Sequence, residues 1–267
     1  MTDTTTKSTD QIRTEWTLGS YPVLAHTFLP LAAELVDAAG VGPDDRVLDV
    51  ACGTGNVALT AHRRGATVTG LDITPAMLEA AREHAGVVDA DVEWREGDAT
   101  DLPVADDAVD VTCSCLGHMF ATDPSAAAEE LLRVTRPGGT VAFNSWTPGS
   151  AIDEMVSTLV DYLPPRPDAP PSPHLWGDPE VVAERLGARV TDLSIQTGTL
   201  DYPALSPAHF WHGMTTDSGP VMVALEAVDE ADRDDLDTAE AATLEPFFAE
   251  GRNAVEQEYL LATATVE

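Results

Sequence analysis

The sequence predicts an α/β fold that is built on a doubly wound, mostly parallel sheet. The first observation is a short apolar strand at residues 47–50 (Val-Leu-Asp-Val), which leads directly into a glycine-rich turn at 51–55. The second is the segment 57–64, which has helical composition and ends at Gly65. A strand, a tight turn and a helix in this order form the first βα unit of such a fold.

The turn is suited to a ligand that lies against the backbone. Gly53 and Gly55 carry no Cβ and can adopt positive φ. From Gly53 to Ala58 the turn also matches Gly-x-Gly-x-x-Ala, so a dinucleotide is one candidate ligand. Asp49 argues against it, because a carboxylate would repel a pyrophosphate bound at the helix N-terminus. The same carboxylate suits a ligand with an ammonium and a sulfonium group, and S-adenosylmethionine is such a ligand.

Residues 47–56 (Val-Leu-Asp-Val-Ala-Cys-Gly-Thr-Gly-Asn) resemble motif I of the class I S-adenosylmethionine-dependent methyltransferases. More narrowly, the chain resembles the group related to ubiquinone/menaquinone C-methyltransferases, from about Trp16 to Trp146. The resemblance implies a Rossmann-like, seven-stranded sheet with an antiparallel last strand and a helical cap or insert. It also implies S-adenosylmethionine as cofactor, with contacts from Asp49 and from the turn residues Ala51, Cys52, Gly53 and Gly55.

The charge of the chain excludes some partners. It has 46 acidic and 14 basic residues, a formal net charge of −32 and one lysine, Lys7. Such a charge repels nucleic acids and anionic membranes. It also destabilises the fold in dilute buffer, whereas molar salt shortens the Debye length to about 3 Å and screens the repulsion. Because the acids are spread along the chain, the composition resembles that of a halophilic, haloarchaeal protein; an acidic partner-binding surface is the alternative.

Composition also indicates the compartment. No stretch approaches the roughly 20 apolar residues of a membrane span, and residues 1–10 lack the apolar core of a signal peptide. The three cysteines form no spaced framework, which fits a reducing compartment. We therefore expect a cytoplasmic protein without a membrane span. Cys113 and Cys115 share one face of a predicted strand, so we expect no metal site.

The N-terminal region supplies two aromatic candidates. Residues 1–12 are expected to form a mobile tail, and an apolar helical stretch is expected over 24–36. Between them, residues 16–21 match a Trp-x-x-Gly-x-Tyr segment of the resembled group. The resemblance implies that Trp16 and Tyr21 close the cofactor site; alternatively, they only anchor the N-terminal helix to the core.

The second strand, 67–71, ends at Asp72, which lies 23 residues after Asp49. That spacing is typical of an acid that binds ribose hydroxyls. A carboxylate offers two acceptors to two vicinal donors, so Asp72 is the expected ribose ligand. The alternative is a solvated aspartate at a strand end.

The next helix is predicted from its N-cap, Thr74, with Pro75 at its first position, and it is expected to end near Gly86. Ile73 and Met77 flank this start and are expected cofactor contacts. A third strand is expected over 91–95.

Residues that follow the third and fourth strands complete the expected cofactor site. Gly97, Asp98 and Ala99 follow the third strand, and the resemblance implies that Asp98 accepts a hydrogen bond from the adenine amine. The fourth strand, 108–113, leads into Ser114 and Cys115. The carboxyl ends of strands face the crevice in this fold, so both are expected to contact the cofactor.

His118 is the titratable candidate after the fourth strand. It is either a catalytic base or a residue that orients the acceptor, or else a structural histidine. A helix is expected from Pro124 to Arg136 after the N-cap Asp123, and residues 133–140 resemble the family's turn before a fifth strand at 141–146.

The rest of the chain resembles the family less. The elements expected there are a helix at 151–163, a proline-rich loop at 164–173, a helix at 179–186, strands at 189–200 and 258–266, and a solvated acidic helix at 229–240. We expect one methyltransferase domain over 1–267, with a cofactor-binding core at 40–148, cap segments at 150–187 and 203–252, and the last strands at 188–201 and 257–267. The candidates for the acceptor pocket are Phe120, Trp146, Trp176, Phe210 and Trp211.

These observations predict an enzyme that transfers a methyl group from S-adenosylmethionine to a small, partly apolar acceptor by in-line displacement. A base is needed only if the acceptor must lose a proton. Two alternatives remain at this point: a protein that binds S-adenosylmethionine without catalysis, and a nicotinamide-dependent oxidoreductase. The sequence identifies neither the acceptor nor the oligomeric state.

Overall fold

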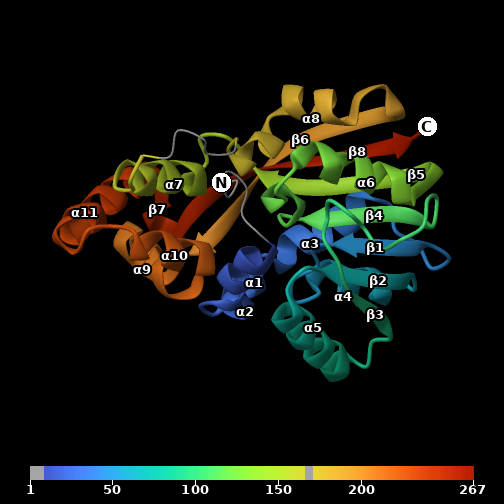
Figure 1. Ribbon diagram of the computed structural model, residues 1–267, viewed down its shortest axis with the longest axis horizontal. Coiled ribbons are helices and arrows are strands. Elements are labelled where there is room, and N and C mark those ends of the chain that lie inside the picture. Colours follow the sequence, from blue (N-terminus) through green and yellow to red (C-terminus); the bar gives the residue numbers. More distant parts are fainter. Residues whose placement is uncertain (1–8, 166–170) are drawn as a thin grey trace, which may run out of the picture.

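One eight-stranded sheet organises the computed structural model, which describes residues 9–165 and 171–267. The strand order is β3-β2-β1-β4-β5-β8-β6, and β7 pairs with β8 beside this path (Figure 1). Neighbours from β3 to β5 pair in parallel, whereas β8 is antiparallel to β5 and β6. The expected mostly parallel sheet with an antiparallel last strand is confirmed. The strands are β1 (Arg46–Val50), β2 (Thr67–Asp72), β3 (Val92–Glu96), β4 (Val109–Cys115), β5 (Thr135–Trp146), β6 (Val190–Pro203), β7 (Phe248–Ala249) and β8 (Ala254–Val266).

Helices cover both faces of the sheet. On one face α3 (Leu29–Ala38) contacts α4 (Asn56–Arg63), and the right-handed crossovers from β1 to β3 place α5 (Pro75–Val88) on the same face. On the other face α6 (Pro124–Val134) contacts α8 (Pro179–Leu186). The central strands β1 and β4 are almost wholly buried because both faces of the sheet are covered there.

The turn after β1 needs its glycines. Gly53 and Gly55 have φ of 51° and 88°, in the region that glycine adopts without strain. A Cβ on Gly55 would lie 2.7 Å from the ring of Trp94, so a side chain there would also displace β3. The expected sequence of strand, tight turn and helix is confirmed, since α4 begins at Asn56.

A helical cap lies beyond the carboxyl edge of the sheet (Figure 1). It consists of α7 (Ala151–Asp161), α9 (Pro207–Asp217), α10 (Gly219–Glu226) and α11 (Arg233–Leu244). The pair β6 and β8 extends into the cap, where Ala204 N–H donates to the Asn253 carbonyl at 2.8 Å. The cap has its own apolar core, which includes Phe210 and Trp211.

The N-terminal region differs from the prediction. Helix α1 (Thr9–Thr17) begins inside the predicted tail, of which residues 1–8 lie outside the described part of the chain. The predicted helical stretch at 24–36 is divided at Phe28 into α2 (Tyr21–Thr27) and α3. The reason is Pro30, which has no N–H to continue the ladder of α2.

Several element boundaries also differ. Helix α6 ends at Val134 rather than at residue 136, because β5 takes over at Thr135. Helix α5 continues past Gly86 to Val88, and the Thr74 side chain makes no capping hydrogen bond. Strands β6 and β8 are longer than predicted because they pair with each other into the cap.

The predicted proline-rich loop at 164–173 is only partly described. Residues 166–170 lie outside the described ranges, and a 3₁₀ turn, η2 (Pro173–Gly177), begins at the last predicted loop residue. Within the described residues, no helix combines the length and the apolar character that a membrane crossing requires.

Candidate cofactor and acceptor site

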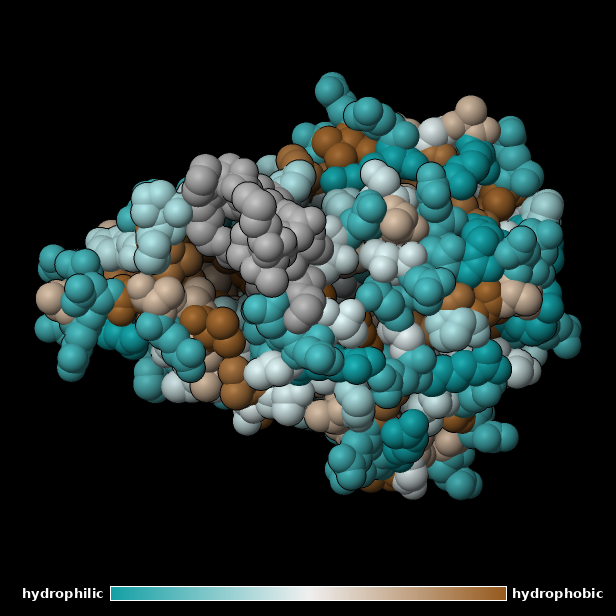
Figure 2. Space-filling view, in the orientation of Figure 1, coloured by the Kyte–Doolittle hydropathy of each residue, from teal (hydrophilic) through white to brown (hydrophobic). Residues whose placement is uncertain are grey.

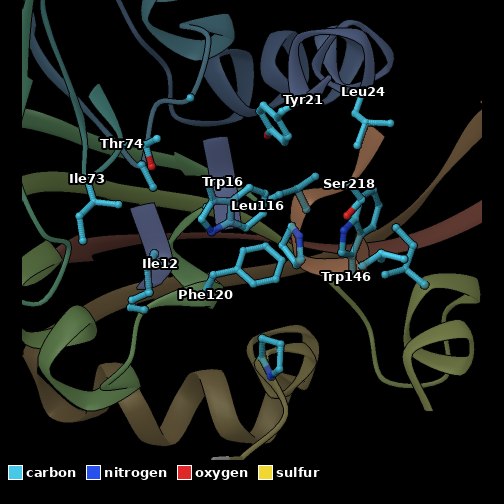
Figure 3. A pocket seen from close by; sticks show the side chains of 18 of the residues that line it. Ile12, Trp16, Tyr21, Leu24, Ile73, Thr74, Leu116, Phe120, Trp146 and Ser218 are labelled. Atoms are coloured by element: carbon cyan, nitrogen blue, oxygen red, sulfur yellow. The ribbon is translucent and has the colours of Figure 1, made fainter. Parts of the chain in front are cut away.

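A cavity of about 380 Å³ lies between the carboxyl edge of the sheet and the cap. Its cofactor half is formed by the sheet edge and the N-terminal helices, with Trp16, Tyr21, Ala51, Gly53, Asp72, Ile73, Met77, Gly97, Asp98 and Ala99. Its acceptor half is mostly formed by the cap, with Trp146, Met155, Val156, Leu159, Val160, Leu163, His174, Met214, Ser218, Val221 and Ala224. Figure 3 shows Ile73 and Thr74 on one side of this cavity, Trp146 and Ser218 on the other, and Trp16 and Phe120 between them.

Asp72 is the central polar group of the cofactor half. It ends β2 and is 7% exposed. Its Oδ2 accepts from Gly53 N–H and its Oδ1 from Thr74 N–H, both at 2.8 Å. Burial raises the pKa of this carboxyl, while the hydrogen bonds from the backbone oppose that shift. Each carboxylate oxygen can accept more than one hydrogen bond, so the group is held in place with capacity left for ligand hydroxyls.

Asp98 lies at the end of β3 and lines the same half. Its Oδ1 accepts from the N–H and the hydroxyl of Thr100, at 2.9 and 2.8 Å. These bonds fix the carboxylate and leave Oδ2 for a donor in the cavity. Gly97 lets the chain pack closely here, because a Cβ there would lie 2.7 Å from the Pro103 ring and 2.9 Å from the Leu71 side chain.

Aromatic rings close the cofactor half. The Trp16 ring centroid lies 5.5 Å from that of Tyr21 and 5.1 Å from that of Phe120, both edge-on. A Cβ on Gly53 would lie 3.3 Å from the Tyr21 ring, so this turn and this ring are closely packed. Burial raises the pKa of Tyr21 far above its ordinary value, so its hydroxyl is un-ionised.

Helix α1 is attached to both sides of the cavity. Arg13 Nε donates to the Ile73 carbonyl at 3.0 Å, and the same guanidinium pairs with Glu96. On the cap side, Gly219 faces the Glu15 carbonyl so closely that a Cβ would lie 1.8 Å from it. Helix α1 therefore covers the cofactor half and connects it to α10.

Five of the predicted cofactor residues do not line the cavity: Asp49, Cys52, Gly55, Ser114 and Cys115. Asp49 is buried, and its Oδ2 accepts from Ala58 N–H at 2.9 Å. Burial raises its pKa to about 8, so this side chain is mostly protonated at neutral pH. In this structure the Asp49 carboxyl holds the turn against α4.

Ser114 and Cys115 end β4 behind the cavity wall. The Ser114 hydroxyl donates to the Val50 carbonyl at 2.7 Å and accepts from His118 N–H at 3.1 Å. These bonds connect β4 to β1 and to the 3₁₀ turn η1 (His118–Phe120). Burial raises the pKa of Cys115 to about 12, which keeps its thiol un-ionised.

His118 does not reach the cavity. It is fully buried, with its ring centroid 4.7 Å from that of Phe143 and 4.5 Å from that of Trp176. Its Nε2 lies 3.3 Å from Ser145 Oγ. Burial, with a smaller effect of Arg185, lowers its pKa to about 3. This placement favours the structural interpretation of His118 over the catalytic one.

The acceptor candidates separate into two groups. Phe120 and Trp146 line the cavity, whereas Trp176, Phe210 and Trp211 are buried in the cores around it. The residues that sequence reasoning missed lie on α7, α9, α10 and η2, and His174 is the titratable one among them. Nothing in its local sequence distinguishes it, since only packing brings η2 to α7. The described residues contain no cluster of three or more His, Cys, Asp or Glu that could hold a metal ion.

Comparisons with known proteins identify the class of domain. Residues 48–143 match the model of a methyltransferase domain family. An uncharacterised protein of Mycobacterium tuberculosis is 38% identical over 257 residues, covering 94% of this chain and 93% of that protein. The demethylmenaquinone methyltransferase of Renibacterium salmoninarum is 39% identical over 105 residues, covering 39% of this chain and 43% of that enzyme. A solved structure of Streptomyces coelicolor geranyl diphosphate C-methyltransferase, with Mg²⁺, geranyl diphosphate and S-adenosyl-L-homocysteine, has a TM-score of 0.53 at 21% identity, over 89% of this chain and 79% of that one.

The fold and the matched domain define a class I S-adenosylmethionine-dependent methyltransferase. The chain belongs to the same family as the uncharacterised M. tuberculosis protein, and its residues 48–143 form the methyltransferase domain. The cofactor fits the residues present, because Asp72 and Asp98 are fixed acceptors that line one cavity. This full-length relative is mycobacterial, so the comparisons do not support a haloarchaeal source. They also give no support to the nicotinamide alternative.

Proposed function

We propose that the enzyme methylates a small, neutral and largely apolar acceptor by in-line displacement. The observation that carries this proposal is the continuity of one cavity from Asp72 and Asp98 to the apolar side chains of the cap. A methyl donor held in the cofactor half and an acceptor held in the other half would meet between them. Holding two reactants in this way accounts for much of the rate gain in such reactions.

The charges around the cavity support a neutral acceptor. Among the described residues that line it, none is lysine or arginine, and no described metal cluster supplies a cation. An anionic acceptor would therefore find no lysine or arginine to offset its desolvation, which costs far more than burying a neutral one. The net charge of −32 further disfavours a nucleic acid.

Each half of the cavity has its own task in this proposal. Bound S-adenosylmethionine supplies a methyl group on a sulfonium, which becomes a neutral thioether on transfer. Asp72 accepts from the ribose hydroxyls, and Asp98 accepts from the adenine amine. Trp16, Tyr21 and Phe120 exclude water from the transfer site, which favours a reaction in which charge is lost.

Substitution of Asp72 tests the cofactor half. Asp72→Ala should weaken S-adenosylhomocysteine binding about 10- to 100-fold, because hydrogen bonds to a charged group contribute about 1.5–3 kcal/mol. The melting temperature without ligand should also fall, since the N–H groups of Gly53 and Thr74 lose their acceptor. Calorimetry measures the first effect and thermal melts the second.

The matched control is Asp91→Ala, which removes an exposed carboxylate before β3. It should leave the affinity unchanged. Equal affinities of Asp72→Ala and the wild type would contradict the ribose assignment. Transfer of labelled methyl groups to compounds of a cell extract, by the wild type and not by Asp72→Ala, would separate catalysis from binding without turnover.

A further inference from the structure

A histidine–aspartate pair lies at the wall of the acceptor half. His174 belongs to η2, is 2% exposed and lines the cavity. Its Nδ1 lies 2.5 Å from Oδ1 of Asp153, in the first turn of α7. Oδ2 of Asp153 accepts from Gly149 N–H at 2.8 Å, so the carboxylate is itself held in place. Because Asp153 occupies Nδ1, Nε2 is the ring nitrogen available to a molecule in the cavity.

Two further titratable or charged side chains pack against η2 at Trp176. His118 of η1 and Arg185 of α8 both lie against the ring of Trp176, with the His118 ring and the guanidinium carbon each 4.5 Å from the ring centroid. Asp153 is the charged group that contacts His174 among the described residues. Of the described residues that line the acceptor half, His174 is also the one with a titratable side chain.

We propose that His174, positioned by Asp153, is the general base of the reaction, and that the acceptor is a neutral apolar molecule with a phenolic or enolic hydroxyl. This inference rests on the proposed function and adds to it the acceptor class and the residue that activates the acceptor. A carboxylate that accepts a hydrogen bond from Nδ1 favours the tautomer in which Nδ1 carries the proton. The lone pair of Nε2 is then free to accept a proton.

The step balances in atoms and charge. The hydroxyl proton passes to Nε2 of His174 as the acceptor oxygen forms a bond to the methyl carbon. The bond between carbon and sulfur breaks, and its electron pair remains on sulfur. One positive charge therefore leaves the sulfonium and one appears on the imidazolium, where Asp153 stabilises it. Burial lowers the pKa of His174 although Asp153 opposes this, so the imidazole is neutral and can accept a proton at pH 7.

The acidity of the acceptor decides between hydroxyl classes. A phenol resembles the tyrosine side chain, whose pKa is about 10, whereas an aliphatic alcohol is a far weaker acid. General-base catalysis is efficient only when the pKa values of base and acid are not too far apart. A histidine with a lowered pKa can assist a phenol or an enol, and it gives an aliphatic alcohol little help.

Two isomeric probes test this proposal. Para-butylphenol and phenylbutanol contain the same atoms and differ mainly in the acidity of the hydroxyl. The wild type should methylate para-butylphenol to its methyl ether and leave phenylbutanol unreacted. His174→Gln should lower turnover of the phenol about 10²–10⁴-fold, the usual contribution of a general base. Its affinity for S-adenosylhomocysteine should change less than about twofold, because His174 lies in the other half of the cavity.

The role of Asp153 needs a measurement that distinguishes the orientation of His174 from general support of the fold. The kcat/KM of the wild type should fall in acid as His174 becomes protonated, and this limb should be lost in His174→Gln. Asp153→Asn should lower kcat more than it raises KM, and Asp153→Glu should restore part of the activity. The control is Asp178→Ala, which removes the cap of α8 beside η2 and leaves the pair intact. It should keep the wild-type pH profile.

The outcomes separate this inference from the proposed function. Undiminished turnover in His174→Gln, or equal turnover of both isomers, would overturn it. So would a wild type that methylates an extract compound and neither phenol nor alcohol, although the proposed function would then stand. A wild type that fails to bind S-adenosylhomocysteine would instead contradict the proposed function.

Discussion

The burial of His118 makes the fold sensitive to acid. Its ring is enclosed by Phe143 and Trp176, and its pKa is lowered to about 3. An unfolded chain binds a proton there near pH 6.5, whereas the folded chain does so only near pH 3. Between these values the unfolded state holds more protons, so stability falls as the pH falls.

The variant His118→Gln should reduce this acid sensitivity. The wild type should lose about 2 kcal/mol from this group between pH 6.5 and 5, at about 1.4 kcal/mol per pKa unit. Urea unfolding at several pH values measures the slope for both proteins. The exposed His212→Gln serves as control and should keep the wild-type slope. Parallel slopes for the wild type and His118→Gln would show that His118 is not the acid-sensitive group.

At the scale of single elements, α11 carries a carboxyl group into the core of the cap. Glu240 is buried, and neither carboxyl oxygen has a hydrogen-bond partner among the described residues. Burial, with repulsion from Asp237, raises its pKa to about 8. The folded chain therefore keeps a proton that the unfolded chain releases near pH 4.5. The stability that this group contributes is fully present below pH 4.5 and is lost as the pH rises to about 8.

Glu240→Gln should stabilise the cap increasingly as the pH rises. The amide keeps the shape of the protonated acid and cannot ionise. The gain over the wild type should be near zero at pH 4 and exceed about 1 kcal/mol at pH 8, since one pKa unit corresponds to about 1.4 kcal/mol. Thermal melts in molar salt measure it, with the exposed Glu245→Gln as control. A gain that does not depend on pH would contradict a buried, neutral Glu240.

At the scale of the whole molecule, charge is the dominant feature. Ion pairs are concentrated on the few arginines; Asp110, for example, contacts both Arg46 and Arg136, and these bonds lower its pKa. The net charge of −32 remains whichever pairs form. The face shown in Figure 2 is mostly hydrophilic, as expected for acids spread along the chain.

Stability should therefore depend strongly on salt. The melting temperature should fall as salt is reduced from molar to tens of millimolar, because the Debye length grows from about 3 Å toward 30 Å and repulsion between the acids returns. Thermal melts in sodium chloride and in the same ionic strength of sodium sulfate distinguish screening from specific ion effects. A melting temperature that is constant over this range would contradict the halophilic interpretation.

The sequence by itself determined the sheet and much of the cofactor half of the cavity, although five predicted cofactor residues do not line it. The turn at Gly53 and Gly55 comes soon after β1, Asp72 ends β2, and Asp98 comes soon after β3, so the strand ends carry them to the carboxyl edge. Local chain geometry is enough for this inference, because parallel strands end at one edge and their successors meet there. The class of cofactor followed from the same short segments.

Only the tertiary structure decided the acceptor half. His174 and Asp153 are 21 residues apart and meet because η2 packs beside the start of α7. The predicted aromatic candidates Trp176, Phe210 and Trp211 instead fill cores, since large rings gain the most free energy when they are fully buried. The packing of distant helices decides which apolar side chain lines a cavity and which fills a core. No periodicity or motif in the sequence predicts that packing.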